Sequence, residues 1–372
     1  MTRCTHRTVV LVKQRKEAAV DIGIFMPTAN NGYIISNNVR FPPTYDLNRE
    51  MTINAEEAGF DFVLSMVKLR GYGGATEHWD YCLESLVLMS ALAECTSKIR
   101  LIGSVGILSL HPAMVARMVA TIDEVSQGRF GLNIVSGWNK LEYSQYGLWP
   151  GDEYYESRYD YAQEYVEILQ GLWENGRLSY DGKYFKLEDA LCQPTPRHPI
   201  EIVCAGQSER GMQFLAGVGN NNFVNAPDVA SVKEISDRVK AVGASVDREI
   251  GTYALFTIIS GETEKEAKRY EEWIREGTDA TALEGFMKAI KSDPVGVSPS
   301  KLQAHAFMGF PTFTGSYEQV AEFLYELDTQ AGVNGVLVTW PDYLKGVQEF
   351  GERVIPSYRG SMSLMKQSSS AV

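Results

Sequence analysis

The fold is decided by the stretch Gly128-Arg129-Phe130-Gly131-Leu132-Asn133-Ile134-Val135-Ser136-Gly137-Trp138. Residues 129–135 form a short apolar run between two glycine-containing turns, which is the pattern of a β-strand buried on both faces. Asn133 interrupts the run, and burying an amide costs about 2–7 kcal/mol unless it is hydrogen-bonded. Because α/β proteins place their chemistry at the carboxyl ends of buried parallel strands, we predict a functional site here.

Seven other segments share this strand pattern, and helical patterns separate them. The eight expected strands cover residues 20–26, 60–65, 99–105, 129–135, 200–204, 222–225, 250–259 and 336–340. Strands that alternate with helices imply a parallel sheet, and eight such units fit an α/β fold of the (β/α)8 TIM-barrel type with insertions. A doubly wound open sheet is less favoured, because it has fewer strands and no G-x-G-x-x-G follows the first strand.

Two segments interrupt the alternation, and the two ends differ from the rest. Residues 179–185 contain Asp181-Gly182, a typical hairpin turn, and residues 279–313 are expected to hold one more helix in an excursion from the barrel. We assign residues 20–358 to a single barrel domain. The basic residues 1–19 are expected to be a disordered extension, with a targeting segment as the alternative, and the Ser-rich residues 359–372 a disordered tail.

The composition restricts the possible partners. The 372-residue chain has a net charge of −12 and no basic face, which argues against nucleic acid and against an anionic membrane surface. Its five cysteines are odd in number and form no C-x-x-C pair, so we expect a reducing, cytoplasmic location. The longest apolar runs have the length of strands, so no membrane span is expected.

The residues that carry out chemistry without a cofactor are poorly represented. The five histidines are isolated and share no metal-ligand spacing, so no metal site is expected. The chain lacks a G-x-S-x-G elbow, a P-loop and a Cys–His signature. An organic cofactor is therefore the expected source of the chemistry.

Four groups of residues follow expected strands and would meet at one end of a barrel. They are Val67-Lys68, then Asn133 with Trp138 and Glu142, then Arg158-Tyr159, and finally Gly206-Gln207-Ser208. A helix amino end with a serine and a glycine suits a phosphate, and an arginine adds a charge-assisted contact. An amide suits the polar edge of a planar heterocycle, and Trp138 would line the substrate side.

Each of these residues also has a purely structural explanation. Asn133 is compatible with a satisfied core amide, and Ser208 with helix capping alone. Glu142 and Arg158 fit surface ion pairs, which are worth about 0–1 kcal/mol. Similarly, Lys68 fits a solvated loop charge, and Trp138 fits packing at the barrel rim. The residues alone leave these alternatives open.

Six segments of the chain carry a family resemblance. They are Ser65-Met66-Val67-Lys68-Leu69-Arg70-Gly71, Ala120-Thr121-Ile122-Asp123, residues 128–138, Trp149-Pro150-Gly151-Asp152, Arg158-Tyr159-Asp160-Tyr161 and Ala205-Gly206-Gln207-Ser208. These segments resemble the luciferase-like flavin-dependent monooxygenases, and more closely the pyrimidine monooxygenase RutA group. The resemblance implies a (β/α)8 barrel and an enzyme that is an FMNH2-dependent monooxygenase.

The resemblance also implies cofactors, partners and site residues. Reduced FMN comes from a separate flavin reductase that consumes NAD(P)H, O2 is the co-substrate, and a flavin peroxide cleaves the ring amide of a pyrimidine such as uracil. The superfamily's habit implies a homodimer or a higher homo-oligomer. The implied FMN contacts are Val67, Lys68, Asn133, Glu142, Arg158, Tyr159 and Ser208. The implied catalytic residues, on the oxygen and substrate side, are Leu64, Ser104, Asn133, Val135 and Trp138.

Two details of this assignment can be tested. We expect Asn133 to act as a pre-organised hydrogen-bond donor at the reacting edge of the flavin. Ser104 stands where the group has a threonine, which keeps the hydroxyl and enlarges the pocket. An alkanesulfonate or sulfone monooxygenase of the same superfamily is the alternative enzyme, and a flavin-binding protein without turnover is the non-catalytic alternative.

Overall fold

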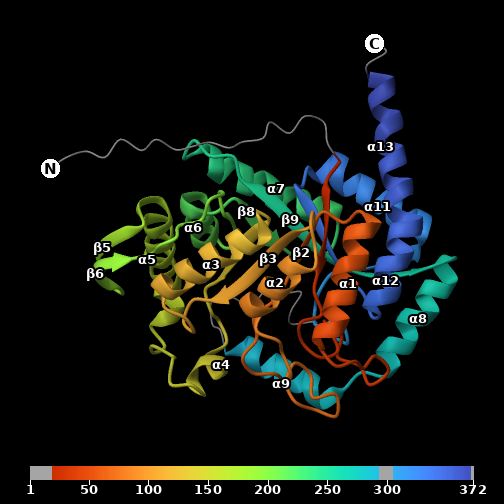
Figure 1. The fold of residues 1–372 in the computed structure, drawn as a ribbon. Coiled ribbons are helices and arrows are strands. Elements are labelled where there is room, and N and C mark those ends of the chain that lie inside the picture. Colours follow the sequence, from red (N-terminus) through yellow and green to blue (C-terminus); the bar gives the residue numbers. More distant parts are fainter. Residues whose placement is uncertain (1–18, 293–304, 370–372) are drawn as a thin grey trace.

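The centre of the molecule is a closed barrel of parallel strands (Figure 1). The computed structural model describes residues 19–292 and 305–369, with the backbone alone for 364–369. The barrel strands are β1 (Asp21–Phe25), β2 (Phe62–Leu64), β3 (Arg100–Gly106), β4 (Phe130–Val135), β7 (Glu201–Ala205), β8 (Asn221–Val224), β9 (Gly251–Gly261) and β11 (Gly335–Thr339). They follow one another around the barrel in this order, and β11 pairs with β1 to close it. The predicted (β/α)8 barrel and its eight strands are confirmed.

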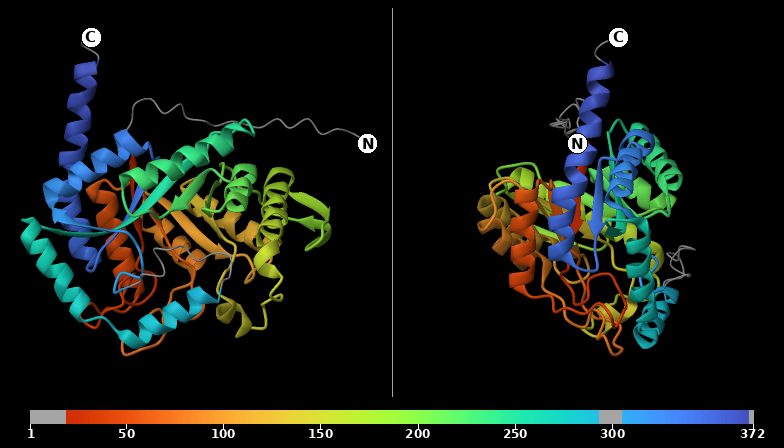
Figure 2. Two further views of the ribbon diagram at one scale, coloured as in Figure 1. Left: turned by 180° about the vertical axis from the view of Figure 1, so that it is seen from behind. Right: turned by 90° about the vertical axis from the view of Figure 1, so that its right-hand side faces the viewer.

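Helices surround the barrel in every view (Figures 1 and 2). They are α1 (Tyr45–Ala58), α2 (Ser85–Glu94), α3 (Pro112–Ser126), α5 (Tyr154–Asn175), α6 (Glu209–Val218), α7 (Val229–Ala244), α8 (Glu264–Glu276), α11 (Tyr317–Glu326), α12 (Tyr343–Glu349) and α13 (Ile355–Ser369). Two π-helical turns, Leu327–Ala331 and Phe350–Val354, follow α11 and α12. A capping box of Ser316 and Gln319 starts α11, and Gly59 ends α1 at a φ of 85°.

Two apolar layers hold the barrel together. One lies between the strands and the helices, and the other fills the barrel interior with side chains such as Phe62, Leu64, Ile102 and Leu255. Alternate residues of each strand face these two layers, which explains why the strands read as continuous apolar runs. This packing makes the barrel a rigid frame for the loops at its ends.

The amino-terminal end of the barrel is sealed by charged and polar groups. Arg100 on β3 lies 2.6 Å from Asp21 on β1 and 2.8 Å from Glu201 on β7. Its guanidinium also donates to Tyr253 Oη at 3.2 Å, and Glu201 accepts from Asn221 at 2.8 Å. These contacts connect five strands, β1, β3, β7, β8 and β9, at this end of the barrel.

The structure corrects several element assignments. A ninth strand, β10 (Thr312–Ser316), pairs with the second half of β9 where no strand is predicted, and a short helix, α4 (Lys140–Ser144), lies after β4. The helix predicted within residues 279–313 is confirmed as α9 (Ala280–Lys291). The sequence pattern predicts a helix over residues 159–173, and α5 extends beyond it at both ends, from Tyr154 to Asn175. The predicted hairpin is confirmed as β5 (Arg177–Asp181) and β6 (Lys186–Leu191), which pair antiparallel.

The carboxyl-terminal segment is helical where a disordered tail is predicted from residue 359. α13 runs to Ser369 and projects away from the barrel (Figures 1 and 2). Its first turn is anchored because Tyr358 Oη donates to Asp328 at 2.7 Å and accepts from the Val20 N–H at 2.9 Å. The predicted extension at residues 1–18 and residues 370–372 lie outside the described residues.

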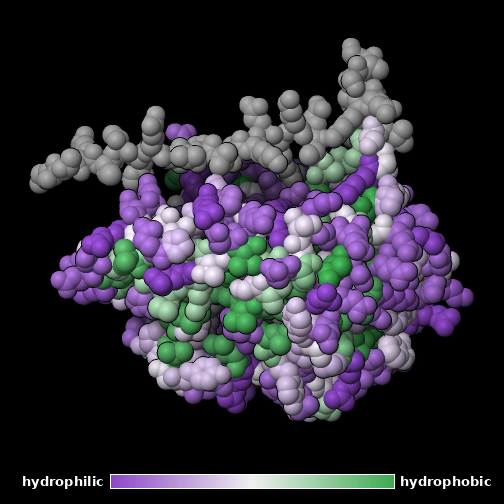
Figure 3. All heavy atoms as spheres, in the orientation of Figure 1, coloured by the Kyte–Doolittle hydropathy of each residue, from purple (hydrophilic) through white to green (hydrophobic). Residues whose placement is uncertain are grey.

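One face of the molecule carries an apolar area. Hydrophobic side chains gather in the middle of the face seen in Figure 3, over α2 and α3, among hydrophilic ones. Val87 on α2 and Met114 on α3 are exposed. None of the described helices has the length and apolar character needed to cross a membrane.

Candidate functional site

A cavity of about 470 Å³ lies at the carboxyl ends of the barrel strands. Its lining comes from the carboxyl ends of β1, β3, β4, β7 and β8, from the segments after β2, β4, β7 and β8, from α4, α5 and α9, and from residues 308 and 310. The cavity brings together the predicted site residues Val67, Lys68, Ser104, Asn133, Val135, Trp138, Glu142, Arg158, Tyr159 and Ser208. Leu64 is the exception, because it is fully buried in the barrel interior and does not line the cavity.

Lys68 and Glu142 form a buried ion pair on the wall of this cavity. The Lys68 ammonium donates to Glu142 and, at 2.9 Å, to Tyr72 Oη. Glu142 also accepts from the Asn139 amide at 2.9 Å and from the Leu69 N–H at 3.1 Å. Both side chains are less than 10% exposed, so the solvated-loop and surface-pair explanations are wrong for them.

The environment keeps Lys68 charged. Burial by itself would lower the pKa of the ammonium, but the oxygens of Tyr72 and Glu142 outweigh burial and raise the pKa above its usual value. The ammonium also lies 5.2 Å from the ring centre of Trp79 and 5.6 Å from that of Trp138. The cavity therefore contains a fixed positive charge between aromatic rings.

Asn133 is oriented by a chain of serine hydroxyls. The Ser104 hydroxyl donates to the Ser65 carbonyl, so it can only accept from the Asn133 amide, which lies 2.8 Å away. This directs Asn133 Nδ2 toward Ser104. Among the described residues, Asn133 Oδ1 has no hydrogen-bond partner although it is buried.

This arrangement changes the chemical role expected for Asn133. It adds an acceptor to the expected role, because one amide hydrogen is bound to Ser104 and the atom without a partner is Oδ1. The pre-organised donor stays a prediction, since Nδ2 carries a second hydrogen. A buried acceptor without a partner is costly, which is why such groups usually meet a ligand or water. Asn133 is thus suited to accept a hydrogen bond from an N–H group in the cavity. Ser104 positions this amide.

The amino end of α6 forms another side of the cavity. Ser208 caps the helix by accepting from the Gly211 N–H at 3.2 Å, as predicted. A Cβ at Gly211 would lie 2.8 Å from Tyr159 Oη, so the absence of a side chain lets Tyr159 pack against this turn. Arg158 is buried beside it, with its guanidinium 5.2 Å from the Tyr159 ring centre. The surface-pair explanation is therefore wrong for Arg158 as well.

These groups match the chemistry of a flavin mononucleotide. Free N–H groups and the positive dipole at the start of a helix, with a buried arginine nearby, suit a phosphate. An unsatisfied amide oxygen suits a heterocyclic N–H, and aromatic side chains suit a planar ring. The residues present therefore fit the cofactor.

Sequence reasoning missed the apolar part of the lining. It consists of Phe25, Met66, Trp79, Phe223, Phe286, Ile290, Met308 and Phe310. The carboxyl-end rule could have identified Phe25 and Phe223, which lie on β1 and β8. No strand pattern points to Phe286 or Met308, because they belong to the excursion between β9 and β11.

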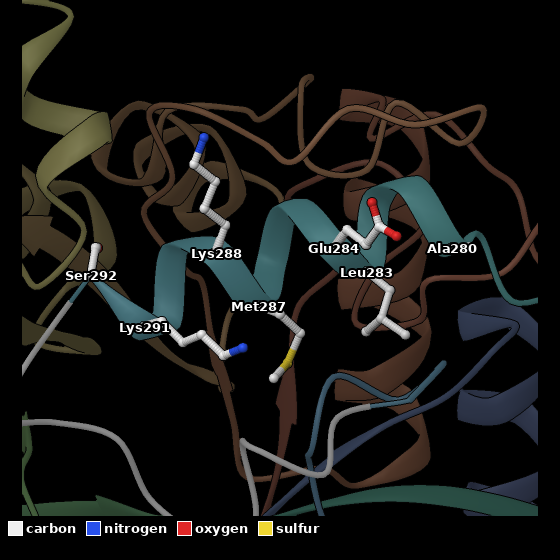
Figure 4. A pocket seen from close by; sticks show the side chains of 7 residues that line it. All are labelled: Ala280, Leu283, Glu284, Met287, Lys288, Lys291 and Ser292. Carbon is white, nitrogen blue, oxygen red and sulfur yellow. The ribbon is translucent and has the colours of Figure 1, made fainter.

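A second hollow of about 650 Å³ lies along α9 (Figure 4). Its lining is confined to one helix and the residue after it, with Leu283 and Met287 pointing to one side and Lys288 to another. None of the predicted site residues lines it. The convergence of loops from several strands favours the barrel cavity as the functional site.

Comparisons with known proteins agree with this site. The family described as luciferase-like monooxygenase matches residues 20–334. Pyrimidine monooxygenase RutA of Rhizobium rhizogenes is 41% identical over 347 residues, which cover 91% of this chain and 96% of that protein. Pyrimidine monooxygenase RutA of a Bradyrhizobium species is 45% identical over 350 residues, with the same coverage.

Solved structures share the fold at low identity. EDTA monooxygenase (EmoA) from Chelativorans superimposes with a TM-score of 0.80 at 18% identity and covers 92% of this chain and 94% of its own. Riboflavin lyase (RcaE), solved with modified FMN and riboflavin, gives a TM-score of 0.78 at 21% identity, with 92% of each chain covered. These likenesses show that the barrel fold is shared.

Proposed function

Because this chain belongs to the luciferase-like monooxygenase family, we propose that it uses reduced FMN and O2 to open the ring of a pyrimidine such as uracil. The family consists of flavin-dependent monooxygenases, and relatives that share 41–45% of the sequence over nine tenths of the chain act on pyrimidines by name. The observation that carries the proposal is the barrel cavity, whose lining contains the amino end of α6, the buried Arg158 and Asn133, the last with a buried Oδ1 that has no partner among the described residues.

The cofactor's phosphate would be held at the amino end of α6. Ser208 and the first N–H groups of the helix supply donors, and Arg158 supplies positive charge. Tyr159 supports this turn through its packing against Gly211. Val67, Lys68 and Glu142 would border the ring system, because they lie on the β2 and β4 sides of the same cavity.

The protein side chains divide the remaining tasks. Bound reduced FMN supplies the electrons that activate O2. Lys68, held charged by Glu142, stabilises negative charge that develops in the cavity. Asn133 Oδ1 accepts a hydrogen bond from an N–H of the flavin ring and thereby orients the ring, while Ser104 holds the Asn133 amide in place. Trp138 and Val135 line the cavity and help to exclude water.

The proposal extends to partners and location. A separate flavin reductase supplies FMNH2, and the protein is located in the cytoplasm. We further propose a homodimer, which the exposed apolar side chains Val87 and Met114 on α2 and α3 support. Sedimentation velocity measures the oligomeric state. A species of 41.4 kDa at micromolar concentration would contradict the dimer.

A reconstituted assay tests the function. The protein is incubated with a flavin reductase, NADH, FMN and a panel that contains uracil and alkanesulfonates, and the products are analysed by mass spectrometry. Loss of uracil and gain of a ring-opened product that depend on the protein support the proposal. Sulfite release without uracil consumption would favour the sulfonate alternative. Flavin binding without any product would favour a non-catalytic protein.

A further inference from the structure

The mouth of the cavity is divided into a polar side and an apolar side. The polar lining comes from β2, β3, β4 and β7, where Lys68, Asn133 and Ser208 lie. From β8 around to β1 the described lining side chains are apolar apart from Asn225. Under the proposed function the polar side holds the flavin, so the apolar side faces the substrate.

Two bulky residues of this lining adopt a backbone conformation that their side chains disfavour. Trp79 has a φ of 62° and Met308 a φ of 57°, both in the left-handed region. Side chains of this size are rarely found there, and such residues persist only where the surrounding structure holds them. Both side chains line the cavity and are less than 10% exposed. Strain of this kind gathers at functional sites.

The contacts that hold Trp79 are specific. Its indole N–H donates to the Gly32 carbonyl at 2.5 Å. The ring packs edge-on against Tyr33 with centres 5.8 Å apart, and the Lys68 ammonium lies 5.2 Å from its centre. Trp79 therefore stands at the boundary between the two sides of the cavity in one fixed orientation.

His78 connects the two strained residues. Its ring stacks on Trp79 with centres 5.1 Å apart, and its Nε2 lies 3.1 Å from the Met308 sulfur. Burial, together with the charge of Lys68, lowers the pKa of His78 to about 3, so the imidazole is neutral. A thioether sulfur only accepts, so the proton is on Nε2. One side chain thus fixes the positions of both Trp79 and Met308.

From this geometry we infer that Trp79 and Met308 form a wall that determines which substrates the cavity accepts, and that His78 is its positioning residue. The wall is apolar, rigid and close-packed, so it rejects substituents that exceed the space in front of it. For a pyrimidine the selected feature is the size of an apolar ring substituent. This inference rests on the proposed function, and it adds residues to which the family resemblance gives no role.

A substrate series tests the wall. We measure kcat/KM for uracil and for its 5-methyl, 5-ethyl and 5-propyl derivatives, using the wild type, Met308→Ala and Trp79→Phe. We expect kcat/KM of the wild type to fall along the series. Met308→Ala should raise the ratio of kcat/KM for 5-propyluracil to kcat/KM for uracil about tenfold or more. A methylene in a tight apolar pocket changes selectivity about 10–200-fold. Trp79→Phe should shift the ratio in the same direction by less.

A matched control separates selectivity from stability. Met89 on α2 is fully buried but does not line the cavity, so Met89→Ala removes the same atoms elsewhere. It should lower the unfolding temperature and leave the ratio unchanged. If Met308→Ala and Trp79→Phe alter kcat/KM for all substrates by one factor, as Met89→Ala would, the inference is wrong.

A double-mutant cycle tests the role of His78. His78→Phe keeps an aromatic ring but loses the donor to Met308. It should raise the ratio of kcat/KM for 5-propyluracil to kcat/KM for uracil in the wild-type background and have no further effect in Met308→Ala. Additive effects would contradict positioning through Met308.

The failure of the proposed function can be told apart from the failure of this inference. If the wild type consumes alkanesulfonates and no pyrimidine, the pyrimidine assignment fails. The change of kcat/KM along an alkanesulfonate chain-length series then tests the wall.

Discussion

The two ends of the barrel use buried polar groups in opposite ways. At the amino end, Arg100 is paired with Asp21 and Glu201, and the network closes on itself. At the carboxyl end, Lys68 is paired with Glu142, but Asn133, which lines the cavity, has a buried Oδ1 without a partner among the described residues. A closed network stabilises the fold, whereas an open one is prepared for a ligand. In TIM barrels the amino face commonly serves stability and the carboxyl face catalysis.

The largest effect is expected for Asn133→Ala at the carboxyl end. Removing the acceptor should lower product formation per FMNH2 oxidised about 100-fold, because pre-organised polar groups supply much of the stabilisation of a transition state. The free energy of unfolding should change by only about 1 kcal/mol, since one neutral hydrogen bond is lost. Turnover and urea unfolding are measured on the same sample. Turnover equal to that of the wild type would show that Asn133 is a structural core residue without a role in the reaction.

The next effect concerns the phosphate. Arg158→Ala should raise the Kd for reduced FMN about 10–100-fold, because a charge-assisted hydrogen bond is worth about 1.5–3 kcal/mol. Reduced riboflavin, which lacks the phosphate, is the control and should lose much less affinity. Both ligands are titrated without oxygen. An equal loss for the two flavins would show that Arg158 does not act on the phosphate.

At the amino end, we expect a substitution to lower stability and leave turnover unchanged. Arg100→Met keeps the aliphatic stem but leaves Asp21 and Glu201 without their cation, which should lower the free energy of unfolding by about 2 kcal/mol at this partly exposed site. Turnover per folded molecule should not change. Chemical denaturation and steady-state turnover check this contrast. A loss of turnover in a fully folded variant would contradict the assignment of stability to the amino end and function to the carboxyl end.

The smallest effect is a pH dependence at the amino end. Although burial opposes it, the N–H groups of Ile99, Lys98 and Ser97 lower the pKa of the Glu56 carboxyl to about 2. The folded pKa is below the ordinary value, so the stabilisation is full above about pH 4.5 and is lost as the pH falls toward 2. Glu56→Gln should therefore destabilise by at most about 1 kcal/mol at pH 6, given solvent screening, and less at pH 3. Urea unfolding at both pH values measures this, and a difference that grows on acidification would contradict it.

The sequence predicts the fold better than it predicts the complete site. Strand patterns identify all eight barrel strands, because strands buried on both faces read as apolar runs. The polar side of the cavity follows from the carboxyl-end rule, which places Lys68 and Asn133 together. The apolar side does not, because Trp79 and Met308 resemble ordinary core residues until their left-handed backbone is seen.

Local sequence patterns do not predict how deep a strand residue lies in the barrel or which partner a hydroxyl binds. An apolar strand residue such as Leu64 can face the interior either below the cavity or into it, and the sequence does not distinguish these depths. The sequence places a hydroxyl at Ser104 but not its hydrogen bond to the Ser65 carbonyl, which turns Asn133 Oδ1 into the unsatisfied atom. Such details depend on three-dimensional neighbours from different strands.

Isotope labelling tests the central claim most directly. The wild type, Asn133→Ala and Arg100→Met are supplied with reduced FMN, uracil and ¹⁸O2, and the products are analysed by mass spectrometry. The account predicts a ring-opened product that carries ¹⁸O from the labelled oxygen in the wild type and in folded Arg100→Met, and about 100-fold less of it from Asn133→Ala. Unlabelled product, or labelled product in equal amounts from all three proteins, would contradict it.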